Sequence, residues 1–285
     1  MSAEIEAAHR QCREIARRHY ENFPVASLWL PRTLRRPVAA IYAFARAADD
    51  IADEGNRADE ERLELLDEYA RRLDALDRGE APAEPQFLAL ADTIRRRQLP
   101  LSLFHDLLNA FRQDVVKKRY ADFGEVRAYC RLSANPIGRL LLILFRADTG
   151  PNRAASDAIC TALQLINFLQ DIESDYARGR IYLPQDEMRR AGVDESHIRA
   201  RRCDPAWRAL IDRQIARARE LLRAGAPLGR ALSGRIGFEM RLILAGGNRV
   251  LDKLQQQNAR GFLGGARLGP GDWVRIFAKA LSRES

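Results

Sequence analysis

The chain has 285 residues, of which 46% are hydrophobic and 30% charged, a balance typical of soluble globular proteins. A net charge of +8 favours an acidic partner such as a nucleic acid, an anionic membrane or a phosphorylated substrate, although arginine-rich solvated helices account for it equally well. Four scattered cysteines without a CxxC pair, and four histidines without zinc-ligand spacing, argue against a zinc enzyme. Neither a signal peptide nor a run of 18 apolar residues is recognisable, so we expect a cytoplasmic protein that does not span a membrane.

Helical periodicity runs through nearly the whole chain, and Ala, Leu and Arg outnumber β-branched residues. The pattern predicts helices at about 3–20, 33–54, 58–78, 85–97, 100–118, 122–146, 152–176, 204–224, 227–256 and 271–282. Pro136 should kink or interrupt the helix at 122–146, with Ser133 and Asn135 available to satisfy the freed backbone groups. No strand, repeat or long linker is indicated, so we expect a single all-α domain over residues 1–285.

The first acidic motif lies in the segment IYAFARAADDIADEG, residues 41–55. Asp49 and Asp53 are four residues apart and share a helix face, whereas Asp50 is peripheral. Their apolar neighbours indicate a largely buried helix, and burying unpaired carboxylates is costly, so a cation must neutralise them. Arg46 contributes and could bind a phosphate oxygen, but few lysines lie nearby. The motif therefore indicates a divalent metal.

The second acidic motif is NFLQDIESD, residues 167–175, which follows an almost wholly apolar approach. Asn167, Asp171 and Asp175 recur every four residues and fall on one stripe of a helix, whereas Glu173 points elsewhere. Mg²⁺ prefers oxygen ligands and is often held by one or two carboxylates together with substrate phosphates. A single DDxxD is common on solvated helix faces. Two acidic motifs on apolar helices predict a diphosphate held between them by Mg²⁺.

Basic and aromatic residues that would complete such a site follow the second motif. Arg178, Arg180 and Tyr182 lie in the turn after it, and Lys117–Arg119 with Tyr120 form a further cluster at a helix end. Each of these is more often a surface residue than a site residue when taken singly. Beside two carboxylate stripes, Arg46, Arg180 and Tyr182 become the stronger candidates.

The motifs DDIAD (49–53), NFLQDIESD (167–175) and GRIYLP (179–184) together resemble the squalene and phytoene synthase family. The resemblance extends from about residue 19 to about residue 254. Within the family, HYENFPVASLWLP (19–31), the segment at 40–55 and SANPIGRL (133–140) most resemble the hydroxysqualene synthases of bacterial hopanoid biosynthesis. The resemblance to the family implies an isoprenoid (terpenoid) synthase fold, in which facing helices bring both motifs to a central cavity.

The resemblance also implies roles for residues that match family motifs. The Mg²⁺ ligands would be Asp49, Asp53, Asn167, Asp171 and Asp175. Catalysis would involve Asp49, Asp53, Asp171, Asp175 and Tyr42. Substrate would be bound by His19, Asn22, Phe23, Arg46, Gln164, Arg180 and Tyr182, with Asn22 in place of the family's usual serine. Beyond the part of the chain that the resemblance covers, Arg267 is a candidate phosphate contact. The cavity lining would include Phe23, Tyr42, Ile137, Leu141, Leu163 and Phe168.

For the hydroxysqualene synthases, the implied reaction is Mg²⁺-dependent ionisation of presqualene diphosphate and capture of the cation by water, the work of a carbon–oxygen lyase. A prenyltransferase that condenses two prenyl diphosphates head to head would need the same ligands. A catalytically silent helical module that binds lipid or a partner is an alternative of another class. The basic residues are scattered, so nucleic acid is not expected. The charge is compatible with peripheral association at the inner membrane face, and the implied pathway with contacts to other hopanoid enzymes.

Overall fold

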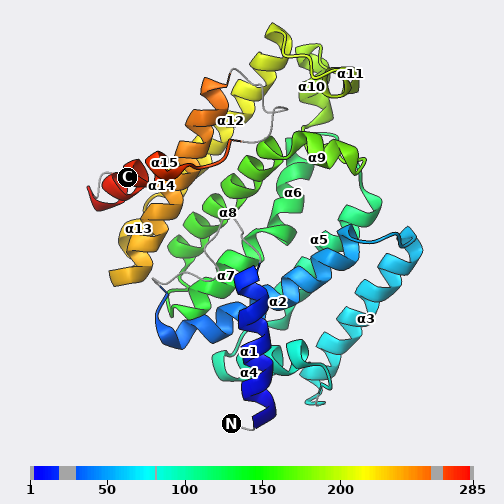
Figure 1. The fold of residues 1–285 in the computed structure, drawn as a ribbon, viewed down its shortest axis with the longest axis vertical. Coiled ribbons are helices and arrows are strands. Elements are labelled where there is room, and N and C mark those ends of the chain that lie inside the picture. The colour runs from blue at the N-terminus through cyan, green and yellow to red at the C-terminus, as the bar shows by residue number, and fades with distance from the viewer. Residues whose placement is uncertain (1–2, 19–29, 81, 258–265, 283–285) are drawn as a thin grey trace. The chain divides into compact units, whose positions relative to one another are not determined.

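The computed structural model describes residues 3–18, 30–80, 82–257 and 266–282 (Figure 1). Within these ranges the chain forms 15 α-helices, and the β structure is limited to an isolated bridge between Arg119 and Ile181. The helices are α1 (Ala3–Arg18), α2 (Arg32–Asp53), α3 (Asp59–Asp77), α4 (Pro85–Arg97), α5 (Leu101–Val116), α6 (Phe123–Ser133), α7 (Asn135–Leu144), α8 (Gly150–Gln170), α9 (Ile172–Ala177), α10 (Gln185–Ala191), α11 (Glu195–Arg199), α12 (Pro205–Gly225), α13 (Leu228–Ala231), α14 (Gly234–Gln256) and α15 (Pro270–Leu281). The prediction of an all-α fold is confirmed.

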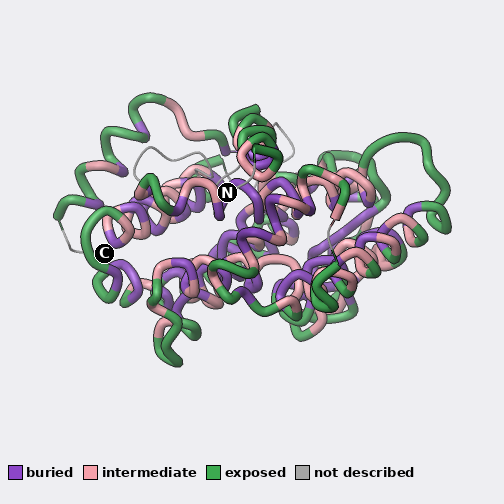
Figure 2. The backbone as a smooth tube through the Cα atoms, turned by 90° about the horizontal axis from the view of Figure 1, so that it is seen from below, coloured by how far each residue is buried: buried purple, intermediate pink, exposed green. Residues whose placement is uncertain are grey.

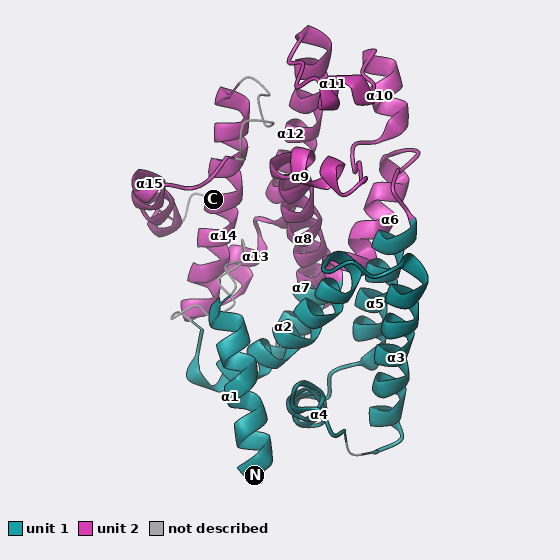
Figure 3. Ribbon diagram, turned by 45° about the vertical axis from the view of Figure 1, so that its right-hand side comes forward, with its two compact units in different colours: residues 1–116, 136–148 teal, residues 117–135, 149–285 magenta. Residues whose placement is uncertain are grey.

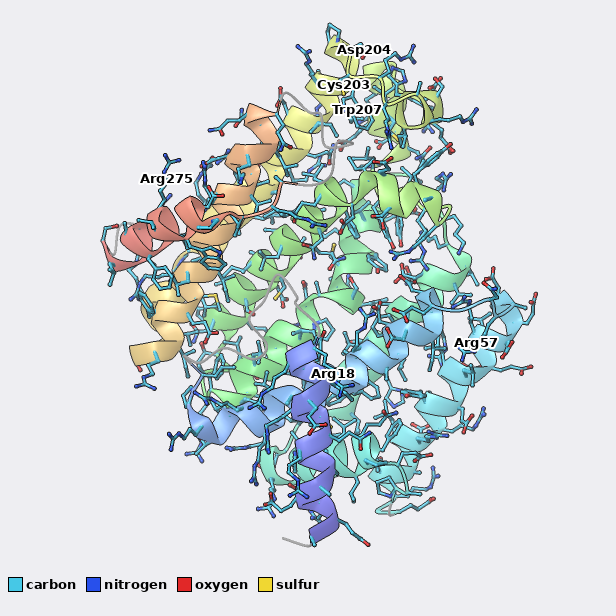
Figure 4. The ribbon with its side chains drawn as sticks, viewed as in Figure 1. Arg18, Arg57, Cys203, Asp204, Trp207 and Arg275 are labelled. Atoms are coloured by element: carbon cyan, nitrogen blue, oxygen red, sulfur yellow. The ribbon has the colours of Figure 1, made fainter. Side chains whose placement is uncertain are left out.

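Several helices begin at side-chain caps that satisfy backbone N–H groups of the first turn. Asp122 accepts a hydrogen bond from the backbone of Glu125 at the start of α6, and Thr149 caps α8. At the start of α12, Asp204 accepts from the backbone N–H of Trp207 at 2.9 Å, and both residues are labelled in Figure 4. Figure 2 shows buried and exposed positions interleaved along the helices, as amphipathic packing requires.

The main differences from the predicted helices are interruptions. The helix predicted at 122–146 is two helices that meet at Ala134, two residues before Pro136, so the expected interruption is confirmed. Asn135 is buried, and the oxygen of its side-chain amide lies 3.1 Å from the hydroxyl oxygen of Thr161. By contrast, the buried hydroxyl of Ser133 has no hydrogen-bond partner among the described residues and does not satisfy a freed backbone group. The helix predicted at 227–256 is divided at Leu232 and Ser233.

Two short helices, α10 and α11, lie in a stretch for which no helix was predicted. Each has seven residues or fewer, too few to show a periodic pattern. The start of α11 does carry a local signal. Asp194 accepts from the backbone of Ser196, and His197 closes a capping box by accepting from the backbone N–H of Asp194.

The chain divides into two compact units, which Figure 3 colours separately. Unit 1 comprises residues 1–116 and 136–148, and unit 2 comprises residues 117–135 and 149–285. The single domain expected from the sequence stays a prediction. Unit 1 contains the first acidic motif and unit 2 contains the second.

Unit 1 combines a small-residue core with an aromatic one. Where α1, α2 and α4 pack together, the core consists mainly of alanines with Cys12, and these small side chains let the helices approach closely. A second core surrounds Phe44, whose ring meets Phe87 and Phe104 edge to face at centroid distances of 5.9 and 5.5 Å. Both cores hold α2, the helix of the first acidic motif.

Unit 2 is organised around α8 and α12, which lie side by side (Figure 1). Gly225 permits this close packing at the end of α12. A Cβ atom there would lie 2.3 Å from Cγ1 of Ile159 and 2.9 Å from the carbonyl oxygen of Ala155. This packing fixes α8, whose C-terminal end begins the second acidic motif. None of the described helices has a stretch long and apolar enough to cross a bilayer.

Candidate active site

The first acidic motif lies on the last turns of α2, an uninterrupted helix. A Nη2 atom of Arg46 lies 2.7 Å from Oδ1 of Asp50 and 2.8 Å from Oε1 of Glu54, and its Nη1 lies 3.4 Å from Oδ2 of Asp49. Burial lowers the pKa of Arg46, but the three carboxylates outweigh it and the net pKa is raised. Arg46 therefore neutralises part of the acidic motif that it was predicted to accompany.

Asp50, predicted to be peripheral to the metal site, pairs with Arg46 in this arrangement, and that prediction stays untested. Tyr42 lies one turn before Arg46 on α2 and packs, half-buried, against the alanine-rich core of unit 1. The structure thus places Tyr42, Arg46 and the aspartates of the first motif on successive turns of one helix.

The C-terminal end of α2 is held by Arg62, a residue that the sequence reasoning did not single out. Its guanidinium donates to the carbonyl oxygens of Ile51 and Gly55, both at 2.7 Å, and of Glu54 and Arg57, both at 3.2 Å. Gly55 has φ of +77°, a conformation that favours glycine. A buried arginine thereby binds carbonyl groups that a helix end leaves without intrahelical partners.

The second acidic motif spans a break between two helices. α8 ends at Gln170, Asp171 has φ −108° and ψ 16°, and α9 begins at Ile172, so the helix predicted at 152–176 is not continuous. The backbone N–H of Asp171 nevertheless donates to Asn167 at 2.9 Å, and that of Asp175 donates to Asp171 at 2.8 Å. Because these four-residue hydrogen bonds persist, Asn167, Asp171 and Asp175 remain at helical spacing across the break.

Asp171 is exposed to solvent, yet the protein atoms around it raise the pKa of its carboxyl group, and Arg178 and Arg267 only partly offset that effect. A nearby cation would favour its charged form. Arg267, expected as a phosphate contact, therefore lies close enough to act electrostatically on Asp171. Gln164 lies half-buried on α8, one turn before Asn167.

Three predicted site residues line the same pocket. Asp175, Arg180 and Tyr182 line one small pocket together with Phe168, Ile172, Ile181, Leu183 and Ile198. Arg180 is buried, and its backbone N–H donates to the carbonyl oxygen of Asp175 at 2.8 Å. The turn after the second motif thus folds back onto α9, and a guanidinium and a carboxylate come to share one pocket.

An aromatic cluster adjoins this pocket. The rings of Phe168 and Tyr182 stack with centroids 3.8 Å apart and planes 5° from parallel. Tyr129 packs against both, at 6.0 and 5.6 Å, and Tyr120 stacks on Tyr182 at 5.5 Å. Sequence reasoning predicted Phe168 and Tyr182 but missed Tyr129, although a tyrosine on the buried face of an apolar helix is a usable signal.

The predicted basic cluster at 117–119 has structural partners. Lys117 pairs with Glu125 at 3.0 Å and lies over the ring of Tyr120. Arg119 makes a two-pronged ion pair with Glu195, at 2.8 and 2.9 Å, and donates to the carbonyl oxygens of Lys118 and Gly179. These contacts tie the turn after the second motif to α11.

Helix α11 and the turn after it also support α9. Glu173 pairs with Arg201, and the side chain of Tyr176 is hydrogen-bonded to Arg199. That Glu173 does not belong to the metal site stays a prediction. His19, Asn22 and Phe23, predicted to bind substrate, lie outside the described residues.

The donor set of the second motif suits Mg²⁺, because Asn167, Asp171 and Asp175 supply amide and carboxylate oxygens. Within the described ranges, no three His, Cys, Asp or Glu side chains converge closely enough to hold a metal by themselves. A magnesium ion at either motif would therefore take its remaining ligands from water or substrate phosphates, which is its common habit in proteins.

Similarity to known proteins extends over most of the chain. Residues 16–272 match the model of the squalene/phytoene synthase family. The chain is 38% identical over 240 residues to a hydroxysqualene synthase of Rhodopseudomonas palustris. The aligned region covers 84% of this chain and 80% of that protein. It is 30% identical over 268 residues to a 15-cis-phytoene synthase of Synechococcus elongatus, covering 90% and 86%.

Among solved structures, a squalene synthase of Alicyclobacillus acidocaldarius matches with a TM-score of 0.84 and 38% identity, covering 90% of this chain and 97% of that one. A ligand-bound dehydrosqualene synthase matches with a TM-score of 0.87, covering 98% and 97%, at 23% identity, which speaks for the fold alone. The predicted isoprenoid synthase fold is thus confirmed, and the chain belongs to the squalene/phytoene synthase family.

Proposed function

We propose that the protein is a hydroxysqualene synthase that converts presqualene diphosphate and water into hydroxysqualene and diphosphate. The observation that carries this proposal is the second acidic motif, whose Asn167, Asp171 and Asp175 keep helical spacing beside the pocket of Arg180 and Tyr182. Relatives named hydroxysqualene synthase, at 38% and 35% identity, support this choice of reaction.

The oxygens of Asn167, Asp171 and Asp175 in the second motif would hold a metal ion, and those of Asp49 and Asp53 in the first motif would also serve as metal ligands. Members of the family use a divalent metal to ionise a diphosphate, and Mg²⁺ would supply Lewis-acid assistance to the departing group. Burial raises the pKa of Asp171, and a cation bound beside it would favour the charged form of its carboxyl group.

Charged side chains of the chain would act on the leaving diphosphate. Arg180, buried in the pocket beside Asp175, would bind a phosphate oxygen and neutralise the charge that develops as the carbon–oxygen bond breaks. Arg46 would do the same near the first motif. The negative charge of the carboxylates would be balanced by the metal, so Arg46 and Arg180 would be released for the phosphates.

The aromatic cluster would protect the carbocation. The rings of Phe168, Tyr182 and Tyr129 present no strong nucleophile and would exclude bulk water. A single admitted water would then attack the cation. Its oxygen forms the new carbon–oxygen bond, and one of its protons is released.

A second candidate is a head-to-head condensing enzyme, favoured by the 38% identity to a squalene synthase structure and by the phytoene synthase relatives. Such an enzyme would use the same two motifs. The two candidates differ in the substrate consumed, because the condensing enzyme requires two prenyl diphosphates and the hydroxysqualene synthase requires presqualene diphosphate.

The deciding experiment incubates the purified full-length protein with Mg²⁺ and either presqualene diphosphate, farnesyl diphosphate or geranylgeranyl diphosphate, followed by product identification. We expect hydroxysqualene from presqualene diphosphate, no consumption of the other two, and loss of turnover in EDTA that added Mg²⁺ restores. Consumption of farnesyl or geranylgeranyl diphosphate alone would replace our proposal with the condensing enzyme. Binding without turnover of any substrate would instead favour the silent lipid-binding module.

A further inference from the structure

The segment 266–269, which leads into α15, lies against the second acidic motif. Gln170, the last residue of α8, donates from Nε2 to the carbonyl oxygen of Ala266 at 2.9 Å, across 96 positions of the chain. Ala266 is fully buried. Gln170 immediately precedes Asp171, a residue of the motif, and Ala266 immediately precedes Arg267. This hydrogen bond therefore brings the chain at Arg267 next to the chain at Asp171.

The half-buried amide group of Gln170 suits this contact in one orientation. Its Nε2 meets a carbonyl oxygen, which accepts hydrogen bonds but cannot donate them. With the amide turned over, two oxygen atoms would face each other. The amide oxygen of Gln170 is shielded from solvent and has no hydrogen-bond partner among the described residues. The hydrogen bond to Ala266 is therefore the polar contact that holds this side chain in the described part of the structure.

The same segment is also held by α14, which packs against both α8 and α15 (Figure 1). Lys253 donates from Nζ to the carbonyl oxygen of Arg267 at 2.5 Å and to Oδ2 of Asp272 at 2.7 Å. Asp272 is buried at the start of α15, and it also accepts from Arg249 at 2.6 Å and from the backbone N–H of Gly269 at 2.8 Å. The carbonyl groups before and after the Cα atom of Arg267 are thus bound, one from α8 and the other from α14.

Arg267 extends an exposed side chain from this fixed backbone. Burial raises the pKa of Asp171, and Arg178 and Arg267 offset part of that rise, so the guanidinium group of Arg267 acts electrostatically on the carboxyl group. Guanidinium groups bind phosphate oxygens through paired N–H donors, and such a contact depends on where the backbone places the group. An exposed arginine on a fixed backbone beside Asp171 can meet a phosphate held at the second motif.

We propose that Gln170 is a positioning residue. By holding Ala266, it places Arg267 where the guanidinium group meets a diphosphate bound at the second acidic motif, and Lys253 holds the same backbone from α14. Gln170 donates to the protein and acts on the ligand only through Arg267. This role rests on the part of the proposed function that both candidate reactions share, a diphosphate held by Mg²⁺ at that motif.

The test is calorimetric titration of the purified full-length protein with inorganic diphosphate at saturating Mg²⁺. Arg267→Met should weaken diphosphate binding about tenfold, because a charge-assisted contact is lost. Gln170→Met keeps the length of the side chain but removes its donor, and should weaken binding about fivefold. In the Arg267→Met background, Gln170→Met should change binding by less than about twofold, because the residue that it positions is already gone. Gln256→Met is the matched control at an exposed glutamine of α14, and it should bind like the wild type.

Hydrogen exchange of the metal-free protein provides a second readout, which does not depend on a ligand. Gln170→Met should speed the exchange of backbone N–H groups at 266–269, whereas Arg267→Met should leave that exchange unchanged. If Gln170→Met does not fold, Gln170→Asn takes its place, since its amide is one methylene too short to reach Ala266.

Equal losses of affinity from Gln170→Met in the two backgrounds would overturn the proposal, because Gln170 would then act independently of Arg267. Unchanged affinity in Gln170→Met, or a wild type that does not bind diphosphate with Mg²⁺, would overturn it as well. The substrate assay decides the reaction separately. Turnover of farnesyl or geranylgeranyl diphosphate alone would replace the proposed reaction but not the role of Gln170, since that reaction also releases diphosphate.

Discussion

An arginine holds the backbone that follows each acidic motif, Arg62 for the first and Arg119 for the second, but the two arginines differ in their partners. Arg62, 8% exposed, donates only to backbone carbonyls, all of them within eleven residues along the chain. Arg119 has a side chain 32% exposed and depends on the carboxylate of Glu195, which is 76 residues away. The first motif therefore has a local support, and the second has a support that exists only after α11 has folded into place.

The difference also concerns the helices themselves. α2 continues through Asp49 to Asp53, whereas the second motif is divided at Asp171 between α8 and α9. A six-residue helix such as α9 is not stable alone, so its position depends on neighbours. Glu173 with Arg201, and Tyr176 with Arg199, supply those contacts. We infer that the first motif is the more rigid of the two and the second the more easily disturbed.

The largest effect is expected at Asp171, which tests whether the divided motif carries the chemistry. Asp171→Asn preserves the shape of the side chain but removes its charge. It should lower kcat by more than about 100-fold, a loss beyond that typical of outer-shell partners of a metal. Steady-state turnover at saturating Mg²⁺ measures it.

Glu173→Gln provides the control for Asp171→Asn, because Glu173 lies two residues further along the chain, in α9, and pairs with Arg201. It should retain turnover within about twofold, since exposed ion pairs contribute little. If Asp171→Asn and Glu173→Gln behaved alike, the second motif would not be the metal site.

A smaller but distinct effect is expected on stability when the first motif loses its support. Arg62→Met leaves four buried or partly buried carbonyl groups without their donor, and should lower the free energy of unfolding by about 3 kcal/mol. Urea-induced unfolding followed by circular dichroism measures it. Arg57→Met is the nearby control, because Arg57 is exposed and lies 3.6 Å from Glu61, and it should change stability by less than about 0.5 kcal/mol.

Arg119→Met allows the contributions of Arg119 and Arg62 to the free energy of unfolding to be compared. It removes a partly solvated ion pair and two carbonyl contacts, so the free energy of unfolding should fall by only about 1 kcal/mol. A loss as large as that of Arg62→Met would show that the two arginines are equivalent and that the comparison drawn from their burial is wrong.

The smallest expected effect is a loss of stability of α11 at low pH. It distinguishes the two motifs, because the support of the second includes a group that titrates and the support of the first does not. Hydrogen bonds from the side chain of Ser196, with His197 and the backbone N–H of Ser196, lower the pKa of Asp194 at the start of α11 to about 2. Because the folded-state pKa lies below the unfolded value of about 3.9, this cap stabilises α11 fully above that value. Its contribution is lost as pH falls from about 4 towards 2.

Hydrogen exchange measured across that range should show α11 opening on acidification before the C-terminal end of α2, whose Arg62 binds carbonyl groups that do not titrate. Asp194→Asn retains a good helix cap without a titrating group, and should flatten the pH dependence at α11. Unchanged acid sensitivity in that variant would assign the opening to another group.

Much of the architecture could be predicted from the sequence because periodicity reports burial directly. The bounds of α2, α4, α5 and α12 agree with the predicted helices to within about two residues, and the interruption before Pro136 follows from the lost N–H of proline. The break at Asp171 could not be predicted from the sequence. Residues 152–176 contain neither proline nor glycine, and the polar stripe continues across the break. After the break, Glu173 of α9 pairs with Arg201, which follows α11.

The sequence by itself determined the class of fold and the chemistry of the two acidic motifs, because both depend on residue types at spacings of four along a helix. Tertiary structure decided which cations and rings stand beside those motifs. Arg62, Arg119 and Tyr129 acquire their partners only when segments fold back on one another. The spacing of apolar residues along a helix identifies its buried face. The side chains that pack against that face come from distant parts of the chain, and only the tertiary structure shows which they are.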